Sequence, residues 1–451
     1  MNKSKIINWF YLASAIALFL FSFRRSISVL FVKDIWLADF AAYSSVSRAI
    51  FEGHNPFPYH FEFLFPDCDF GRVVPIVYPG QMLFFFLPGY FWGNGIQIAF
   101  TLLTVFILCF LTGLTLVKAC GYQPHDLWMP GKKQFLFAVC CACFLGSCNV
   151  MEGLRTGQIT VLLAFCLYCL FWGPASRFLQ IFLFAFAAVV KYSILPVIAP
   201  ILFFKGHWKL CIAAFFVFVF LSVSPVLFGN DLQELYTEYF RAVQLMFQPE
   251  SGLNHYDSNP IMCHLGFFRI PIINHILKAV AVGFILWLFW RERKTRYISD
   301  TLMLLGLCLT LLISYHKGYD LTLIFPLLFI RLFDFVKTKQ WGLFGITASF
   351  LLFLMLPRSV SFLIIPSWIG GLMPRADSVI YMYNDLWGTH YKHVFPIMPF
   401  YTIALTLWSM YLYLHVKNPY RFELPVAGAD TPGDGVEVRE EVPKADLDPK
   451  E

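Results

Sequence analysis

Apolar residues run through this chain in long blocks that are separated by short polar segments. The blocks at 96–117, 209–228 and 395–416 are each close to the length of about 20 residues that a helix needs to cross a bilayer. Strands of a transmembrane barrel would alternate apolar and polar residues, and the block at 302–313 does not. Backbone polar groups in lipid must be hydrogen-bonded within their own segment, so the blocks predict helices. The pattern predicts an all-α polytopic membrane protein with about 10–13 transmembrane helices.

Composition agrees with this prediction. Hydrophobic residues make up 58% of the chain and charged residues 14%, whereas soluble proteins carry about 25% charged residues. The first apolar block, 6–23, precedes Arg24 and Arg25 without a small-residue cleavage site, which favours an uncleaved signal anchor. No pair among the twelve cysteines has the partners of a zinc site. We therefore expect no metal, no cofactor and no nucleic-acid partner.

Clusters of Lys and Arg assign the two membrane faces, because such clusters concentrate on the cytoplasmic side. The densest cluster is 291–296. Segments assigned to the other face are longer and contain most of the acidic, histidine and tyrosine residues. We therefore expect the chemistry on the extracytoplasmic face, in a bacterial inner membrane with the site towards the periplasm. The segments on that face are 24–77, 149–158, the turn at Lys191, 229–260, 316–320 and 358–393.

Two regions are expected. Residues 1–421 form the transmembrane domain, within which 24–77 is the first extracytoplasmic loop. Residues 422–451 hold nine acidic and three basic residues, are rich in Pro and Gly, and have no aromatic residue after Phe422. That composition predicts a disordered acidic tail on the cytoplasmic side.

The first outer loop contains an ordered set of polar and turn residues. Residues 43–51 predict a short helix that ends near Gly53, and Asn55 followed by proline predicts a turn. Asp39 comes just before this helix. A carboxylate there is either an N-cap or a reactive group at the membrane surface.

Three further charged segments are candidates for binding. Arg155 either binds an anion such as a phosphate or is an interfacial charge. Lys191 divides the block 178–204 into a predicted hairpin of two short helices. A charge at mid-bilayer costs about 2.5–3.5 kcal/mol on insertion scales, so Lys191 either is functional or snorkels to the interface. His316 and Asp320 would share a helix face and form either a working pair or a structural salt link.

Taken in order, these motifs resemble glycosyltransferase family 87, a group of polyprenyl-phosphate-sugar-dependent enzymes of the GT-C superfamily. The family has an Asp before a Tyr-containing helix, matched here by Asp39 and Tyr43. Gly80 stands where a second proline is usual, and this leaves the substrate open. The remaining matches are Gly53, Asn55 to Phe57, Tyr78-Pro79, Gly157-Gln158, Lys191-Tyr192 with Pro196, and Tyr319-Asp320-Leu321 with Pro326.

The resemblance implies a GT-C fold with the catalytic residue in the first outer loop, and Asp39 matches that position as the general base. It also implies inverting transfer of mannose, or of another hexose or a pentose, from a polyprenyl-phosphate donor to a hydroxyl of a glycolipid or glycan acceptor. We assign donor-phosphate binding to Lys191, Arg155 and His316. Substrate binding is assigned to Tyr43, Asn55, Tyr78, Gln158, Tyr192, Tyr319, Asp320 and His255.

Two other functions fit parts of the sequence. Intramembrane Lys191 and the broken helices also suit a transporter or flippase of lipid-linked sugars, although no internal repeat of the kind common in transporters is visible. A structural or assembly protein is the third possibility. It predicts that changes at Asp39, Lys191 and His316 alter stability only.

Overall fold

The structure is a computed structural model, and it describes only part of the chain. The described residues are 3–28, 38–57, 94–172, 176–191, 195–246, 280, 283–288, 290–292, 298–313, 318–355, 362–364, 380–385, 388–396, 398–416 and 421–422.

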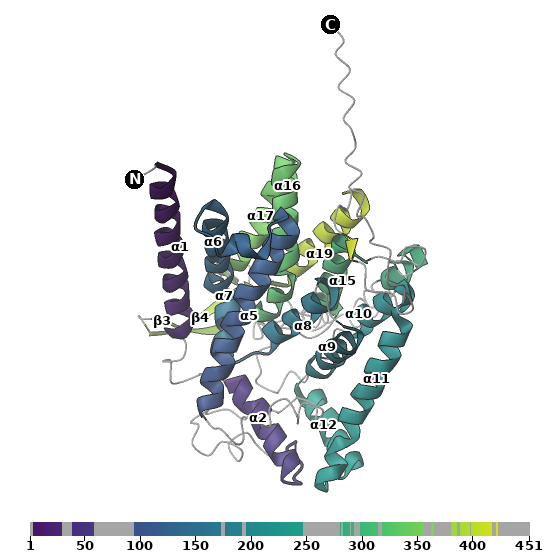
Figure 1. Cartoon of the computed structure of the whole chain (residues 1–451). Coiled ribbons are helices and arrows are strands. Elements are labelled where there is room, and N and C mark those ends of the chain that lie inside the picture. The colour runs from purple at the N-terminus through teal and green to yellow at the C-terminus, as the bar shows by residue number, and fades with distance from the viewer. Residues whose placement is uncertain are drawn as a thin grey trace.

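Most of the described chain is helical, as the apolar blocks predict (Figure 1). The longer helices are α1 (Lys3–Ser28), α2 (Ala38–Phe51), α5 (Asn94–Cys120), α6 (Lys132–Gly146), α7 (Cys148–Thr156), α8 (Thr160–Trp172), α9 (Arg177–Val190), α10 (Leu195–Leu202), α11 (Trp208–Val223), α12 (Leu232–Met246), α15 (Asp300–Ile313), α16 (Phe325–Lys337), α17 (Trp341–Met355) and α19 (Met398–His415). Shorter helical turns are η3 (Pro124–Leu127), η5 (Phe203–His207), η6 (Ser224–Phe228) and η9 (Gly318–Ile324).

Two helical stretches in the described part are long and apolar enough to cross a membrane. They are Ile98–Cys120 in α5 and Ile198–Phe228. The second is not straight, because Gly206 has a φ of +88° and separates α10 from α11. The aromatic rings of Phe215, Phe216 and Phe220 on α11 are all at least 60% exposed. Large apolar side chains on an outer surface suit contact with lipid, so these helices indicate a membrane protein.

Within the described residues, five short strands accompany the helices, and the apolar pattern did not predict these strands. They are β1 (Ile298–Ser299), β2 (Phe362–Ile364), β3 (Ile380–Asp385), β4 (Gly388–Pro396) and β5 (Arg421–Phe422). β4 pairs antiparallel with β2 and with β3, and β1 pairs antiparallel with β5. The prediction of an all-α chain therefore holds for the main architecture but misses these small sheets.

Helix α2 lies with α12 at the end of the molecule away from the N-terminal end of α1 (Figure 1). α2 begins at Ala38, five residues before the predicted start. Phe40 explains the early start, because it is 3% exposed and its ring lies 4.7 Å from that of Phe100 on α5. Asp39 therefore lies inside the first turn of α2, and its interpretation as an N-cap is wrong.

The C-terminal end of α2 is fixed against the segment between η6 and α12. Gly53 has a φ of +78°, and a β-carbon there would lie 2.9 Å from the carbonyl oxygen of Phe228. Asn230, which is 8% exposed, donates from Nδ2 to the carbonyl oxygens of Ile50 at 2.6 Å and Pro225 at 3.2 Å. These contacts cap the last turn of α2 and set the direction of the helix.

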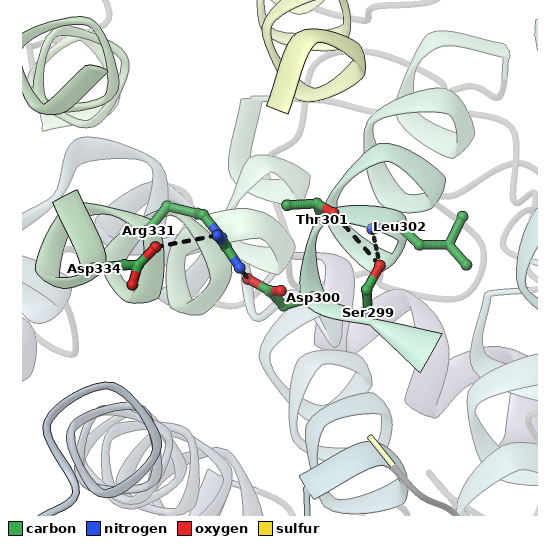
Figure 2. Close-up of polar contacts among 6 residues, drawn as sticks. All are labelled: Ser299, Asp300, Thr301, Leu302, Arg331 and Asp334. Carbon is green, nitrogen blue, oxygen red and sulfur yellow. Dashed lines mark hydrogen bonds and ion pairs between the residues drawn. The ribbon is translucent and has the colours of Figure 1, made fainter. Parts of the chain in front are cut away.

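A buried ionic network joins α15 to α16 (Figure 2). The guanidinium of Arg331 is 0% exposed and contacts Oδ2 of Asp300 through two nitrogens. Its Nη1 lies 3.3 Å from Oδ2 of Asp334. Ser299 caps α15 by accepting a hydrogen bond from the amide of Leu302 at 3.1 Å. This network ties the two helices together within an otherwise apolar core.

Residues that the charge pattern places on one face also contact each other. Lys205 donates from Nζ to the carboxylate of Glu292 at 2.5 Å and to its carbonyl oxygen at 2.9 Å. The hydroxyl of Tyr413 donates to the same carboxylate, and Arg291 lies over the Tyr413 ring at 5.1 Å. These segments all belong to the face predicted to be cytoplasmic.

Candidate functional site

The first part of the site joins α2 to the loop between α7 and α8. Tyr43 is 1% exposed, and its hydroxyl donates to Oε1 of Gln158 at 3.1 Å. Asp39 comes four residues before Tyr43, so its backbone position is one turn earlier on the same face of α2. The side chain of Asp39 lies outside the described part of the structure.

Local backbone geometry places Gln158 at this point. Gly157 follows α7 with a φ of +73°, in the left-handed region that glycine favours. The amide of Gln158 then donates to the carbonyl oxygen of Gly153 at 2.8 Å. This is the usual way in which a glycine ends a helix, and it places Gln158 in the short connection before α8. α8 begins two residues later, at Thr160.

The second part of the site is centred on Asp320, in the helical turn η9. Asp320 is 1% exposed, and a single oxygen, Oδ1, receives two contacts. The hydroxyl of Thr160 donates to this oxygen at 2.5 Å. Nζ of Lys191 lies 2.5 Å from the same oxygen. Three segments that are distant in the sequence therefore meet at one carboxylate oxygen.

Lys191 occupies the break between α9 and α10. Its backbone leaves the helical region at φ −149° and ψ 82°, while its amide still bonds to the carbonyl oxygen of Ala187 at 3.0 Å. The predicted division of this block into two short helices at Lys191 is therefore confirmed. The Lys191 side chain is 22% exposed. An ammonium has three N–H donors, so Lys191 has donors for an anion while its contact with Asp320 is kept.

Asn55 forms the predicted turn. Its Oδ1 accepts a hydrogen bond from the amide of Phe57 at 3.1 Å, and the Phe57 ring packs 5.3 Å from Tyr239 on α12. Nδ2 of Asn55 is buried and has no hydrogen-bond partner within the described residues. The turn therefore closes the outer loop onto α12 and leaves one amide donor for another group.

The other predicted site residues are described only in part. The backbones of Arg155 and Tyr319 belong to α7 and η9, but their side chains are outside the described part. Tyr78, Tyr192, His255 and His316 lie wholly outside it. The predicted pairing of His316 with Asp320 therefore stays a prediction. In the described part, no three residues among His, Cys, Asp and Glu are grouped as they would be around a metal ion.

Sequence reasoning missed Thr160 and the direct contact between Lys191 and Asp320. The sequence marks Lys191 by its place in an apolar block and Asp320 by its place in a motif. Nothing local to either segment shows that they pair, because the pairing depends on how α9 packs beside α8 and how α8 packs against η9.

Comparison with known families identifies the family of this chain. The model of glycosyltransferase family 87 matches residues 77–314, slightly more than half of the chain. The chain belongs to glycosyltransferase family 87. No curated protein and no solved structure matches it. The resemblance seen in the sequence motifs is thereby confirmed.

The family 87 match covers only part of the candidate site. Gln158, Thr160 and Lys191 lie inside the matched range, whereas Tyr43 and Asp320 lie outside it. The structure joins the two groups through the Tyr43–Gln158 hydrogen bond and the Lys191–Asp320 ion pair. The site of this family 87 protein is thus built from both the matched region and the segments that flank it.

Proposed function

We propose that this family 87 glycosyltransferase moves a sugar from a polyprenyl-phosphate donor to a hydroxyl of a glycolipid or glycan, on the extracytoplasmic face of a multi-pass membrane domain of GT-C fold. The sugar is mannose, or another hexose or a pentose. The observation that carries the proposal is Lys191 at a helix break, whose side chain is 22% exposed and whose ammonium lies 2.5 Å from a buried carboxylate. A fixed cation at the membrane surface suits the phosphate of a lipid donor.

The reaction is a single displacement. The acceptor oxygen forms a bond to the anomeric carbon while the bond from that carbon to the phosphate oxygen breaks. The electron pair of the broken bond stays on the polyprenyl phosphate, and the acceptor proton passes to the carboxylate of Asp39. One displacement inverts the anomeric centre. A base placed in this way contributes about 10² to 10⁴ in rate.

The described residues support separate roles at the two ends of this step. α2 is held at its C-terminal end by Asn230, and Tyr43 fixes its face against Gln158. Asp39 shares that face, which suits a base whose position must be kept. Lys191 would stabilise the negative charge that develops on the departing phosphate, with Arg155 and His316 as further cations. Tyr43, Asn55, Gln158 and Asp320 would contact or position the substrates, together with Tyr78, Tyr192, His255 and Tyr319.

The test is sugar transfer by the purified protein in lipid nanodiscs. A panel of radiolabelled polyprenyl-phosphate sugars is supplied with a glycolipid extract, and Asp39→Asn is compared with Glu52→Gln. Glu52 lies just beyond α2 in an exposed pair with Arg48, so its change controls for loss of a carboxylate nearby. We expect transfer to fall by about 10² to 10⁴ in Asp39→Asn and to stay near wild type in Glu52→Gln.

Two results would contradict the proposal. Full activity of a folded Asp39→Asn protein would remove Asp39 as the base. No transfer from any donor, with movement of the labelled lipid across the bilayer, would favour the transporter function.

A further inference from the structure

We propose that Thr160 is a positioning residue for the donor phosphate, acting through Asp320 to aim the ammonium of Lys191. The inference rests on the proposed function, and it adds a residue that neither the motifs nor the family match assigns to a role. Thr160 would not touch the donor. It holds the carboxylate that holds the cation.

The geometry supports this order of contacts. Thr160 and Asp320 are 2% and 1% exposed, whereas the side chain of Lys191 is 22% exposed. The hydroxyl and the ammonium meet at the same carboxylate oxygen, each at 2.5 Å. The more buried partner is therefore a neutral hydroxyl, and the cation belongs to the more exposed side chain. An anionic ligand that reaches the site meets Lys191 first.

Helix α8 holds the Thr160 hydroxyl in place relative to η9. Two turns beyond Thr160, the hydroxyl of Tyr168 donates to the carbonyl oxygen of Leu323 in η9 at 2.6 Å. α8 and η9 are thus joined at two points, Thr160–Asp320 and Tyr168–Leu323. Two bonds between the same elements fix both their spacing and their rotation, so the Asp320 carboxylate has one orientation.

The hydrogen bond of Thr160 differs from those of other buried threonines. Thr104, Thr112 and Thr310 each donate to the carbonyl oxygen four residues earlier in their own helix. This is the common arrangement for a threonine within a helix. Thr160 instead donates to an ionised side chain in another element, and hydrogen bonds to charged groups are about twice as strong as neutral ones. Thr160 is the first residue of α8, so no carbonyl four residues earlier belongs to its helix, and its hydroxyl is free to reach Asp320 in η9.

The catalytic consequence concerns the charge on the phosphate. As the bond from the sugar breaks, negative charge grows on the leaving oxygen, and a cation that is already aimed needs no reorganisation. Without the hydroxyl, the carboxylate loses one of the contacts that orient it, and the ammonium can shift with it. Misplacement of a catalytic group by about 1 Å can cost about 100-fold in rate. The donor phosphate carries one negative charge before the reaction and gains a second as the bond breaks, so the loss should be larger in kcat than in KM.

The experiment compares Thr160→Val, Thr160→Ser and Thr104→Val in the nanodisc transfer assay. Val keeps the shape of Thr and removes the hydroxyl, and Ser keeps the hydroxyl. We expect Thr160→Val to lower kcat about 10- to 100-fold with little change in KM. Thr160→Ser should stay within a few-fold of wild type. Thr104→Val, which removes a hydroxyl that is equally buried in α5, should retain wild-type kcat.

Specific results would overturn the inference. Wild-type kcat in Thr160→Val would do so, and so would a Thr160→Ser protein as impaired as Thr160→Val. If Thr160→Val does not fold, Thr160→Ala removes the hydroxyl without added bulk and takes its place. If the wild type transfers no sugar at all, the proposed function fails, and Thr160 is judged by thermal stabilisation with free polyprenyl phosphate. Equal stabilisation of wild type and Thr160→Val would then overturn it.

Discussion

Gly53 approaches Phe228 so closely that a β-carbon on Gly53 would lie 2.9 Å from the Phe228 carbonyl oxygen. The φ of Gly53, +78°, is also in the region that other residues rarely adopt. The chain therefore turns out of α2 beside the end of η6, where the rings of Phe51 and Phe228 also lie 5.0 Å apart. Because α2 carries Tyr43, this contact helps to hold the Tyr43 hydroxyl at Gln158.

Gly53→Ala should destabilise the protein by about 1–3 kcal/mol, since it combines a strained backbone with a close contact. Transfer activity should fall as well, because α2 must shift to admit the methyl group. Gly345→Ala is the matched control, since a β-carbon at Gly345 on α17 meets nothing within 4 Å. The measurement is unfolding in mixed micelles beside the transfer rate. Equal stability of the two variants would contradict the expectation.

The ion pair of Lys191 and Asp320 should respond unequally to loss of either partner. Lys191→Met leaves a carboxylate that is 1% exposed without its cation, and loss of one partner from a buried pair costs about 3–5 kcal/mol. Asp320→Asn leaves an ammonium whose side chain is 22% exposed and reaches water, so it should cost less. The double variant should be more stable than the sum of the two changes predicts. Additive effects in this cycle would show that the two groups do not interact.

The sequence predicts the parts of this protein that depend on neighbouring residues. Apolar runs predict the body of α5 and α11, glycine predicts the end of α2 near Gly53, and asparagine predicts the turn at Asn55. These features follow from local chemistry. The lysine at the helix break is also visible in the sequence, because a charge is rare in an apolar block.

The contacts that assemble the site are not local and could not be predicted in this way. Tyr43 reaches Gln158, and Lys191 meets Thr160 at Asp320, only once α2, α8, α9 and η9 have packed. The early start of α2 has the same origin, because Phe40 gains its burial from Phe100 on another helix. The small strands were missed because the hydropathy pattern indicates membrane-spanning helices and carries no information on pairing between distant segments.

Tyr236 lies on α12, outside the apolar spans, and we expect it to make the protein less stable at alkaline pH. Its hydroxyl donates to the carbonyl oxygen of Ser222 at 2.7 Å, and burial raises the pKa of Tyr236 to about 12. A raised tyrosine pKa means that the folded state favours the protonated form. The stabilisation that the protonated Tyr236 gives the folded state is therefore present below the ordinary tyrosine pKa of about 10, and it is lost as the pH rises towards 12.

Thermal unfolding measured from pH 9 to 12 in wild type and Tyr236→Phe checks this expectation. The stability difference between the two proteins should shrink above about pH 10. Tyrosinate absorbance followed in both proteins isolates the titration of Tyr236. A difference that stays constant over the whole range would show that this hydroxyl is not linked to folding.

Arg331 should contribute strongly to the stability of the fold, although it is not one of the candidate site residues. Its guanidinium is fully buried between Asp300 and Asp334 (Figure 2), so Arg331→Met leaves two carboxylates without their cation. Loss of one partner from such a network costs about 3–5 kcal/mol. Changing Asp300 and Asp334 to Asn in the same protein should restore much of this loss, because the charges that lack a partner are removed with it.

An exposed arginine provides the control for this change. Arg241 on α12 is 70% exposed and lies 3.6 Å from Glu238, and exposed pairs contribute about 0–1 kcal/mol. Arg241→Met should therefore unfold almost as the wild type does in mixed micelles. Folded Arg331→Met should keep its KM for the donor, because the network lies on α15 and α16 and does not contact Lys191 or Tyr43 through any described hydrogen bond. If the triple variant is no more stable than Arg331→Met, the cost lies in lost packing of the long side chain and not in the two unpaired carboxylates.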